Sequence, residues 1–190
     1  DVTNKIFLKK LSQNIISKYK YVDIIIHNVG GGGRWGKPDV DQTKSSVWDE
    51  VYQKNIKGII FLNKIFCKLM KKNNWGRVIT VASINGSEVN FGDRPWFTAA
   101  KSAQISISKN YSKMKQFTNS GVTFNCVSPG PIDIKGTGWD KEKNKNKKKM
   151  NLWIKENIPA NRLGKPEEIA DLVLFLSSDF ASYVNGCNIR

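Results

Sequence analysis

The chain has 190 residues, of which 39% are hydrophobic and 11% aromatic, enough apolar surface for the core of one domain. It has no run of about eighteen apolar residues and no basic-then-apolar leader, so we expect a cytoplasmic protein without a membrane span. The net charge of +15 favours acidic or phosphorylated partners. No helix-turn-helix, zinc-finger or base-stacking motif accompanies it, so we do not expect nucleic-acid binding. Three widely spaced cysteines are typical of reduced thiols and predict no metal site.

Three apolar runs have the composition of buried parallel strands. Residues 24–26 are three isoleucines closed by a glycine-rich stretch, and residues 77–83 and 121–130 contain similar β-branched runs. We expect each to be buried on both faces. A further strand is expected to begin in residues 185–190.

Helical patterns separate the strands. Residues 45–72 and 95–116 carry apolar or small positions at helical spacing, which predicts stripes facing a sheet. The predicted rows are Val47, Val51, Asn55, Gly58, Leu62, Ile65 and Leu69 in the first, and Ala100, Ala103, Ile107, Tyr111 and Met114 in the second. A last helix is expected to begin near Pro166, because Glu167 and Glu168 suit a first helical turn.

The alternation of strands and helices predicts an α/β fold with a parallel sheet, in one domain over residues 1–190. Residues 140–150 are rich in lysine and asparagine, and we expect them to form a mobile loop between the last two strands.

Four residues are candidates for chemistry. The Asn55 amide lies on an apolar stripe and needs bonding partners, which helix packing alone could also supply. Ser83 ends a strand at the carboxyl edge of the sheet, where α/β proteins bind ligands, or it caps a turn. Phe97 and Lys101 are four residues apart and share a helical face, although a single lysine is usually solvated.

These positions have the spacing of a known family, and the chain resembles the short-chain dehydrogenases/reductases from residue 1 to residue 190. The Asp-Val pair at 1–2 resembles the family's adenine contact, and "HNVG" at 27–30 stands where Asn-Asn-Ala-Gly is usual. The segment "NCVSPGPI" at 125–132 is similar to the family's segment beside the nicotinamide. Residues 164–186 are similar to the family's C-terminal helix and the strand that follows it.

The resemblance implies a Rossmann-like doubly wound sheet, NAD or NADP as cofactor, and interconversion of an alcohol and a ketone on a small-molecule substrate. It also implies a homo-oligomer, a dimer or tetramer. The residues that it assigns to the dinucleotide are Asp1, Val2, Asn28, Gly30, Lys101, Pro129, Gly130 and Ile132. Asn55, Ser83 and Lys101 match three members of its Asn-Ser-Tyr-Lys catalytic set. By the resemblance, Ser83 holds the substrate oxygen, Lys101 the ribose, and Asn55 a water leading from Lys101 to solvent.

One departure is the absence of the family's first strand and Gly-x-x-x-Gly-x-Gly turn ahead of Asp1. The glycines at 30–33 follow the strand that leads to Asn28, so they match a later loop of the family. We therefore expect this chain to be part of a longer protein. Loss of cofactor binding is the alternative.

The second departure is Phe97, which stands where the family has its proton-donating tyrosine. General acid catalysis contributes a factor of roughly 10² to 10⁴, so hydride transfer by the usual route should be slower by that order. Three explanations stay open: a substitution made to trap a complex, a natural phenylalanine with another acid, or loss of catalysis. Glu88, Asp93 and Arg94 are the nearby groups for the second.

The substrate side has weaker signals. Arg94 with Trp35 and Trp96 could form a polar, aromatic wall for a sugar or phosphorylated substrate, although Arg94 pairing with a surface acid explains it equally well. Residues 133–150 correspond to the family's substrate-lid loop, and their lysines suit an acidic ligand such as acyl carrier protein. His27 is expected to be structural. The expected function is reduction of a 3-oxoacyl or sugar-type substrate; the alternative is a catalytically inactive binding protein of this fold.

Overall fold

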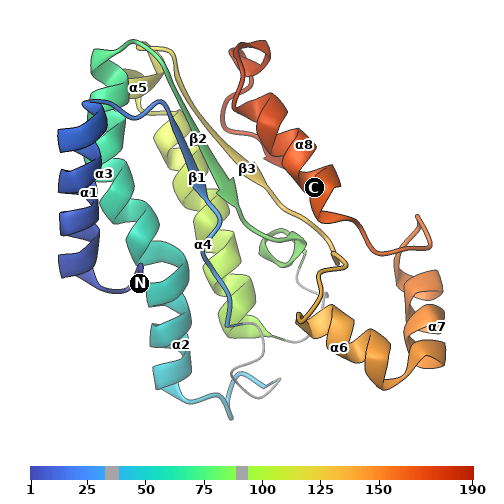
Figure 1. Ribbon diagram of the computed structural model, residues 1–190. Coiled ribbons are helices and arrows are strands. Elements are labelled where there is room, and N and C mark those ends of the chain that lie inside the picture. The colour runs from blue at the N-terminus through green and yellow to red at the C-terminus, as the bar shows by residue number, and fades with distance from the viewer. Residues whose placement is uncertain (33–38, 89–93) are drawn as a thin grey trace.

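The computed structural model describes residues 1–32, 39–88 and 94–190. Their strands form one parallel sheet in the order β1-β2-β3-β4 (Figure 1). The strands are β1 (Ile24–His27), β2 (Gly76–Val81), β3 (Val122–Val127) and β4 (Asn188–Ile189). This confirms the predicted α/β class with a parallel sheet, including the short strand at the C-terminal end.

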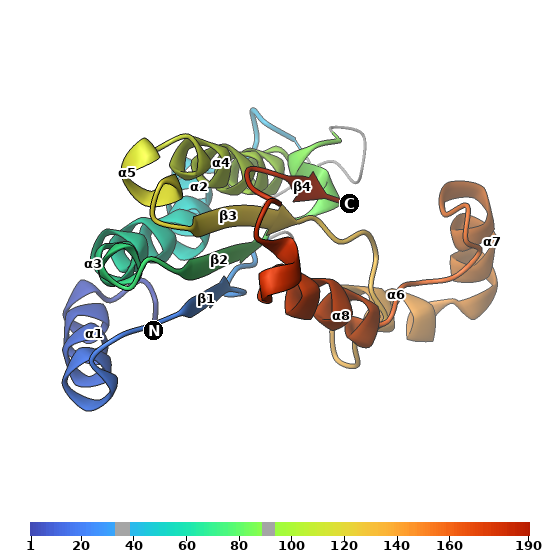
Figure 2. The same cartoon turned by 90° about the horizontal axis from the view of Figure 1, so that it is seen from above.

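Helices cover both faces of the sheet, as Figure 2 shows, with α3 and α4 on one face and α8 on the other. The helices are α1 (Lys5–Tyr19), α2 (Ser45–Tyr52), α3 (Gly58–Lys72), α4 (Pro95–Ser112), α5 (Lys115–Thr118), α6 (Gly138–Lys145), α7 (Lys147–Asn157) and α8 (Pro166–Leu176). The start of α8 at Pro166 confirms the prediction, and Glu168 accepts a hydrogen bond from the Lys165 main-chain N–H at 2.7 Å.

Each face of the sheet has its own apolar core. On the α3 face, Phe66 and Met70 pack against Val78 and Phe124. On the α8 face, Ile79 and Val127 pack against Leu176 and Ala181, among others. Burying each large apolar side chain stabilises the fold by roughly 1.5–3 kcal/mol, so the two cores hold β2 and β3 firmly at the centre.

The prediction that the first strand is buried on both faces was wrong. Ile25 and His27 are buried, whereas Ile24 and Ile26 are 41% and 49% exposed. The reason is that β1 is the edge strand of the described sheet, and α8 packs chiefly against β2 and β3. One face of β1 therefore contacts α3 while the other remains uncovered.

The helix predicted over residues 45–72 is present, but a π-helical turn over Gln53–Lys57 interrupts it. Because its hydrogen bonds span five residues instead of four, a π turn holds an extra residue and changes the phase of the helix behind it. Val51 and Asn55 are buried as predicted. Behind the turn Gly58 is buried as predicted, but the most buried row then runs through Asn63, Phe66 and Met70. The predicted Leu62, Ile65 and Leu69 are half-buried beside it and pack against the same core.

The buried row of α4 also differs from the prediction. Ala100 is buried, but the positions that follow are Lys101, Gln104, Ile105 and Ser108, and Met114 is 41% exposed beyond the helix end. Apolar periodicity missed this face because three of its six buried side chains, those of Lys101, Gln104 and Ser108, are polar. A helix that buries polar groups beside strand ends is a natural place to look for chemistry.

The predicted mobile loop at 140–150 is helical instead, since it contains most of α6 and the start of α7. The side chain of Asn146 caps α7 by accepting a hydrogen bond from the Lys149 N–H at 2.9 Å. The rings of Trp139 and Trp153 pack 4.9 Å apart and join the two helices. The sequence did not indicate these helices because they are lysine-rich and bury almost no apolar side chain that would give a periodic pattern.

Candidate functional site

The glycine-rich turn after β1, the π turn and α4 meet at the carboxyl end of the sheet. A methyl group placed on Gly30 would lie 2.6 Å from Asn55 Oδ1 and 3.1 Å from Lys101 Nζ. Only a residue without a side chain permits so close an approach of the main chain. Three predicted site residues, from three different segments, are therefore in one place.

Asn55 holds the glycine-rich turn against the helix. Its side-chain Nδ2 donates to the carbonyl oxygens of Gly31 (2.9 Å) and Val51 (2.8 Å), and its Oδ1 accepts from the Gly31 N–H (3.2 Å). The buried amide is thus bonded to main-chain groups on both sides. The π turn supplies the local geometry, and such turns are frequent at functional sites.

Lys101 is a buried cation at this end of β2, only 5% exposed, so the solvated alternative was wrong. Its Nζ donates to Gln104 Oε1 at 2.9 Å and to the Val81 carbonyl at 3.3 Å. Burial lowers the pKa of Lys101 to about 8, and the nearby Cys126 thiol opposes the shift. The Phe97 ring centre lies 5.5 Å from the ammonium, within cation–π distance.

Ser83 lies two residues beyond Val81, the strand residue that Lys101 contacts. Its Oγ accepts a hydrogen bond from the Asn85 N–H at 3.2 Å, so the serine caps a short 3₁₀ turn over Ile84–Gly86. That turn rests on α4, because the Ser102 hydroxyl donates to the Gly86 carbonyl at 2.7 Å. The half-buried Ser83 is consequently held at the same end of β2 as Lys101.

The predicted aromatic and polar wall is only partly described. Trp96 does not line an open wall: it is buried against Val51 and Ala100, and its indole N–H donates to the Gly32 carbonyl at 2.9 Å. The Trp96 ring lies on the inner side of α4, where it packs against α2. Arg94 is half-buried just before α4, whereas Trp35 and Asp93 lie outside the described residues. Glu88 forms an exposed ion pair with Arg190.

The proposed adenine contacts lie around an open cavity of about 770 Å³ beside the start of the chain. Asp1, Val2 and Val29 line it together with residues of α2 and the π turn. The Asp1 carboxylate accepts from the main-chain N–H and the hydroxyl of Thr3, both at 2.9 Å. Asn28 belongs to a smaller neighbouring cavity of about 100 Å³, which Val2 also lines.

The loop after β3 is open at Gly130, where a methyl group would meet no atom within 4 Å. The main chain of Pro129 accepts a hydrogen bond from the Ile84 N–H at 3.0 Å, which joins this loop to the turn behind Ser83. Ile132 pairs with Gly164 in an isolated parallel bridge. The loop is therefore held at both ends with an exposed glycine between them.

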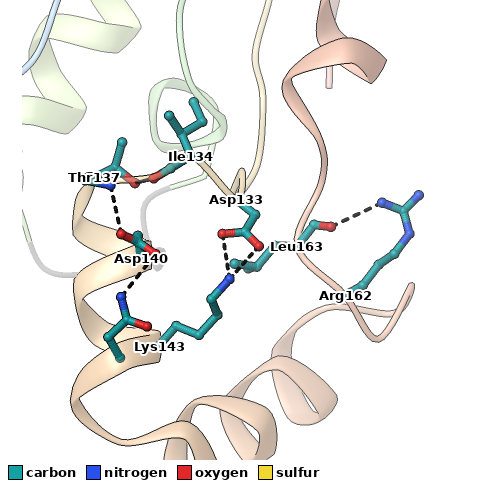
Figure 3. A network of polar contacts seen from close by, with 9 residues as sticks. Asp133, Ile134, Thr137, Asp140, Lys143, Arg162 and Leu163 are labelled. Carbon is teal, nitrogen blue, oxygen red and sulfur yellow. Dashed lines mark hydrogen bonds and ion pairs between the residues drawn. The ribbon is translucent and has the colours of Figure 1, made fainter.

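The lid predicted over residues 133–150 is tied to the same loop (Figure 3). Lys143 of α6 donates to both carboxylate oxygens of Asp133, at 2.7 and 2.9 Å. The hydrogen bond with Asp133 raises the pKa of Lys143. The hydroxyl of Thr137, the residue just before α6, donates to the Ile134 carbonyl at 2.6 Å. Figure 2 shows α6 and α7 projecting from the body.

His27 has a buried side-chain partner within the fold. His27 is buried with its Nε2 2.8 Å from Asn63 Oδ1, and burial lowers its pKa. In the part of the chain that the structure describes, no three potential metal ligands form a group. Across the same residues no helix is long and apolar enough to cross a bilayer.

Sequence reasoning missed Gln104. It is fully buried, accepts from Lys101, and donates from Nε2 to the main-chain oxygen of Asn55 at 2.9 Å. The signal was available, because a glutamine three residues after a candidate lysine shares its helical face. Gln104 therefore joins Lys101 directly to the main chain of Asn55.

Comparison with known sequences places these residues in context. A family model described as enoyl-(acyl carrier protein) reductase matches residues 1–190. The 3-oxoacyl-[acyl-carrier-protein] reductase FabG of Salmonella typhimurium is 30% identical over 186 residues, which are 98% of this chain and 71% of that protein. The FabG of Haemophilus influenzae is 30% identical over 192 residues, covering 100% of this chain and 74% of that one.

Solved structures give the same picture of the fold. YwfH, described as an NADPH-dependent reductase involved in bacilysin biosynthesis, matches with a TM-score of 0.84 at 29% identity. Levodione reductase matches with a TM-score of 0.87 at 24% identity. Both matches cover 100% of this chain and 72% of the compared chain.

Proposed function

Because this chain belongs to the short-chain dehydrogenase/reductase family of NAD(P)-dependent oxidoreductases, we propose that it interconverts an alcohol and a ketone on a 3-oxoacyl substrate. The observation that carries the proposal is the meeting of Gly30, Asn55 and Lys101 beside the Phe97 ring. The 3-oxoacyl choice follows the FabG relatives, which are named for reduction of such substrates on acyl carrier protein.

The residues present fit a dinucleotide, NAD or NADP. The bare main chain at Gly30 allows a ligand to reach Lys101 and Asn55, where a side chain would fill the space. Gly130 supplies a second exposed main-chain segment, next to Pro129, whose carbonyl bonds the Ile84 N–H beside Ser83. Asp1, Val2 and Asn28 would hold the adenosine half, and Pro129 to Ile132 the nicotinamide half.

When bound, a nicotinamide cofactor supplies or accepts the hydride. Ser83 would donate a hydrogen bond to the substrate oxygen from its hydroxyl, one lone pair of which accepts from the Asn85 N–H. Lys101 would bond the ribose hydroxyls with the donor capacity left beside Gln104 and Val81. Its pKa of about 8 keeps it mostly charged at neutral pH.

Phe97 sets the limit on this chemistry. Its ring occupies the position from which a tyrosine would give a proton to the substrate oxygen, and a phenyl ring has none to give. The proton would have to come from water or from another group, and turnover should be slower by roughly 10² to 10⁴. Glu88 is a poor substitute because it is exposed and paired with Arg190.

The substrate carrier would approach over α6 and α7, which we propose as the substrate lid. Their lysines suit an acidic partner through long-range attraction, which weakens as salt is added. A homo-oligomer, dimer or tetramer, is part of the same proposal, as in the family.

The second candidate is a protein of this fold that binds a dinucleotide without turning over, and Phe97 is the observation that favours it. The two candidates separate in one assay. NADPH and NADH binding is measured by fluorescence, and oxidation of each is followed with a 3-oxoacyl substrate for the wild type and for Phe97→Tyr. We expect binding by both proteins and a rise in kcat of about 10²-fold or more in Phe97→Tyr.

The matched control is Ser83→Ala in the Phe97→Tyr protein, which should remove most of the gain while cofactor binding persists. Binding without turnover in both proteins would favour the inactive alternative. No binding of either dinucleotide would overturn the proposal.

A further inference from the structure

We propose that Gln104 is a positioning residue that fixes the ammonium of Lys101 to the main chain of Asn55. The inference rests on the proposed function only in assigning the ribose to Lys101. The bonding that carries it is present in the chain itself.

Gln104 joins the two halves of the site with both ends of one side chain. Its Oε1 lies 2.9 Å from Lys101 Nζ, and its Nε2 lies 2.9 Å from the Asn55 main-chain oxygen. Gln104 is 0% exposed and Asn55 is 1% exposed, so water does not compete for these bonds. Buried hydrogen bonds of this kind are costly to remove because their partners cannot turn to solvent.

The orientation of the carboxamide follows from its neighbours. An ammonium is only a donor and a carbonyl oxygen only an acceptor. The Gln104 oxygen must therefore face Lys101, and its NH₂ must face Asn55. Neither a hydrocarbon nor a carboxylate at this position can satisfy both partners.

The link determines what Lys101 can do. Its Nζ has one further protein acceptor, the Val81 carbonyl at 3.3 Å. Two acceptors leave one of the three ammonium N–H groups for a ligand. A carboxamide has no proton that titrates near neutrality, so the connection holds the cation in place without passing protons. Such a connection is consistent with Phe97, because a phenyl ring gives up no proton that a relay through Lys101 would have to restore.

Two variants separate positioning from packing. Gln104→Met keeps the volume and removes both hydrogen bonds. Gln104→Glu keeps an acceptor for Lys101 but removes the donor to Asn55. Both should lower the midpoint of urea unfolding, because the Asn55 oxygen loses its partner in each. The exposed Gln13 of α1 provides the control Gln13→Met, which should change nothing.

The deciding measurement is the ¹⁵N–¹H cross peak of the Lys101 ammonium, assigned with Lys101→Arg. A bonded, buried ammonium exchanges slowly and gives a visible signal. We expect the peak in the wild type and Gln104→Glu and its loss in Gln104→Met. NADPH affinity should fall at least fivefold in Gln104→Met and much less in Gln104→Glu.

An equally sharp Lys101 peak in Gln104→Met, or loss of the peak in both variants in step with their stability, would overturn the inference. Failure of the wild type to bind NADPH or NADH would instead count against the proposed function, while the cross peak still decides the role of Gln104.

Discussion

A buried cation lies at each end of β2, and the two cations differ in their hydrogen-bond partners. Arg77 is the second residue of the strand and is 2% exposed. Lys101 reaches the last strand residue, Val81, from α4 and is 5% exposed. The two cations are therefore almost equally buried, and they differ in the partners that surround them.

The Arg77 guanidinium has main-chain acceptors for three of its five N–H groups, and its Nη2 lies 3.6 Å from Asp179. It donates to the carbonyls of Gly76, Gly121 and Ser178 at 2.9 to 3.1 Å and stacks 4.3 Å from the Trp75 ring centre. Lys101 has only two acceptors. Burial lowers the pKa of both cations, but arginine remains charged at any ordinary pH whereas lysine approaches neutrality. The arginine end is built for stability, and the lysine end keeps donor capacity for a ligand.

The largest effect is expected at the arginine end. Arg77→Leu leaves three carbonyls without their donor and should lower the free energy of unfolding by about 3–5 kcal/mol. Urea titration followed by circular dichroism measures this. Arg77→Lys, which keeps the charge with fewer donors, should lose less. A loss below about 1 kcal/mol in Arg77→Leu would contradict the comparison.

The lysine end should instead show a pH-dependent effect. Lys101 has a pKa near 8 in the folded chain and near its ordinary value of about 10.4 when unfolded. Between these values the unfolded state binds more protons, so this group makes stability rise as pH rises through that window. The gain is about 3 kcal/mol in total.

The measurement is the difference in unfolding free energy between the wild type and Lys101→Met at pH 7 and pH 10. The buried Cys67 thiol, whose pKa burial raises, is present in both proteins and cancels. Cys126 and Lys101 shift each other's pKa, so both proteins are also compared with Cys126→Ala in place. The difference should move in favour of the wild type by a few kcal/mol. A constant difference across this range would show that Lys101 is not buried as described.

The sequence predicted the four strands and the helical segments that contain α2, α3, α4 and α8. It did not predict α1, α6 or α7, or which helix positions are buried. The family resemblance placed Asn55, Ser83 and Lys101 in one site, and the strand-edge argument independently placed Ser83 at the carboxyl edge of the sheet. The π turn could not be read from apolar spacing, and the row through Phe66 behind it is more buried than the predicted one. Gln104 was not predicted because apolar periodicity takes no account of polar residues. Its role in the site comes from its two hydrogen bonds, to Lys101 and to Asn55.

A smaller effect is expected where the main chain approaches Lys101. Gly30→Ala places a methyl group 2.6 Å from Asn55 Oδ1, which is itself bonded to the Gly31 N–H. Displacing this group should lower stability by about 1–3 kcal/mol and weaken dinucleotide binding. Gly130→Ala, where a methyl group meets nothing within 4 Å, is the stability control. Equal stability of both variants would argue against the close contact.

The smallest effect should come from the carboxylate beside Arg77. Asp179 lies 3.6 Å from the guanidinium, but its side chain is 87% exposed, so solvent screens the attraction. Its Oδ1 also accepts from the Trp75 indole N–H at 2.7 Å, a bond that Asp179→Asn can keep through its amide oxygen. We therefore expect Asp179→Asn to change the free energy of unfolding by less than about 1 kcal/mol. A loss approaching that of Arg77→Leu would mean that the ion pair, and not the three carbonyls, stabilises this end of β2.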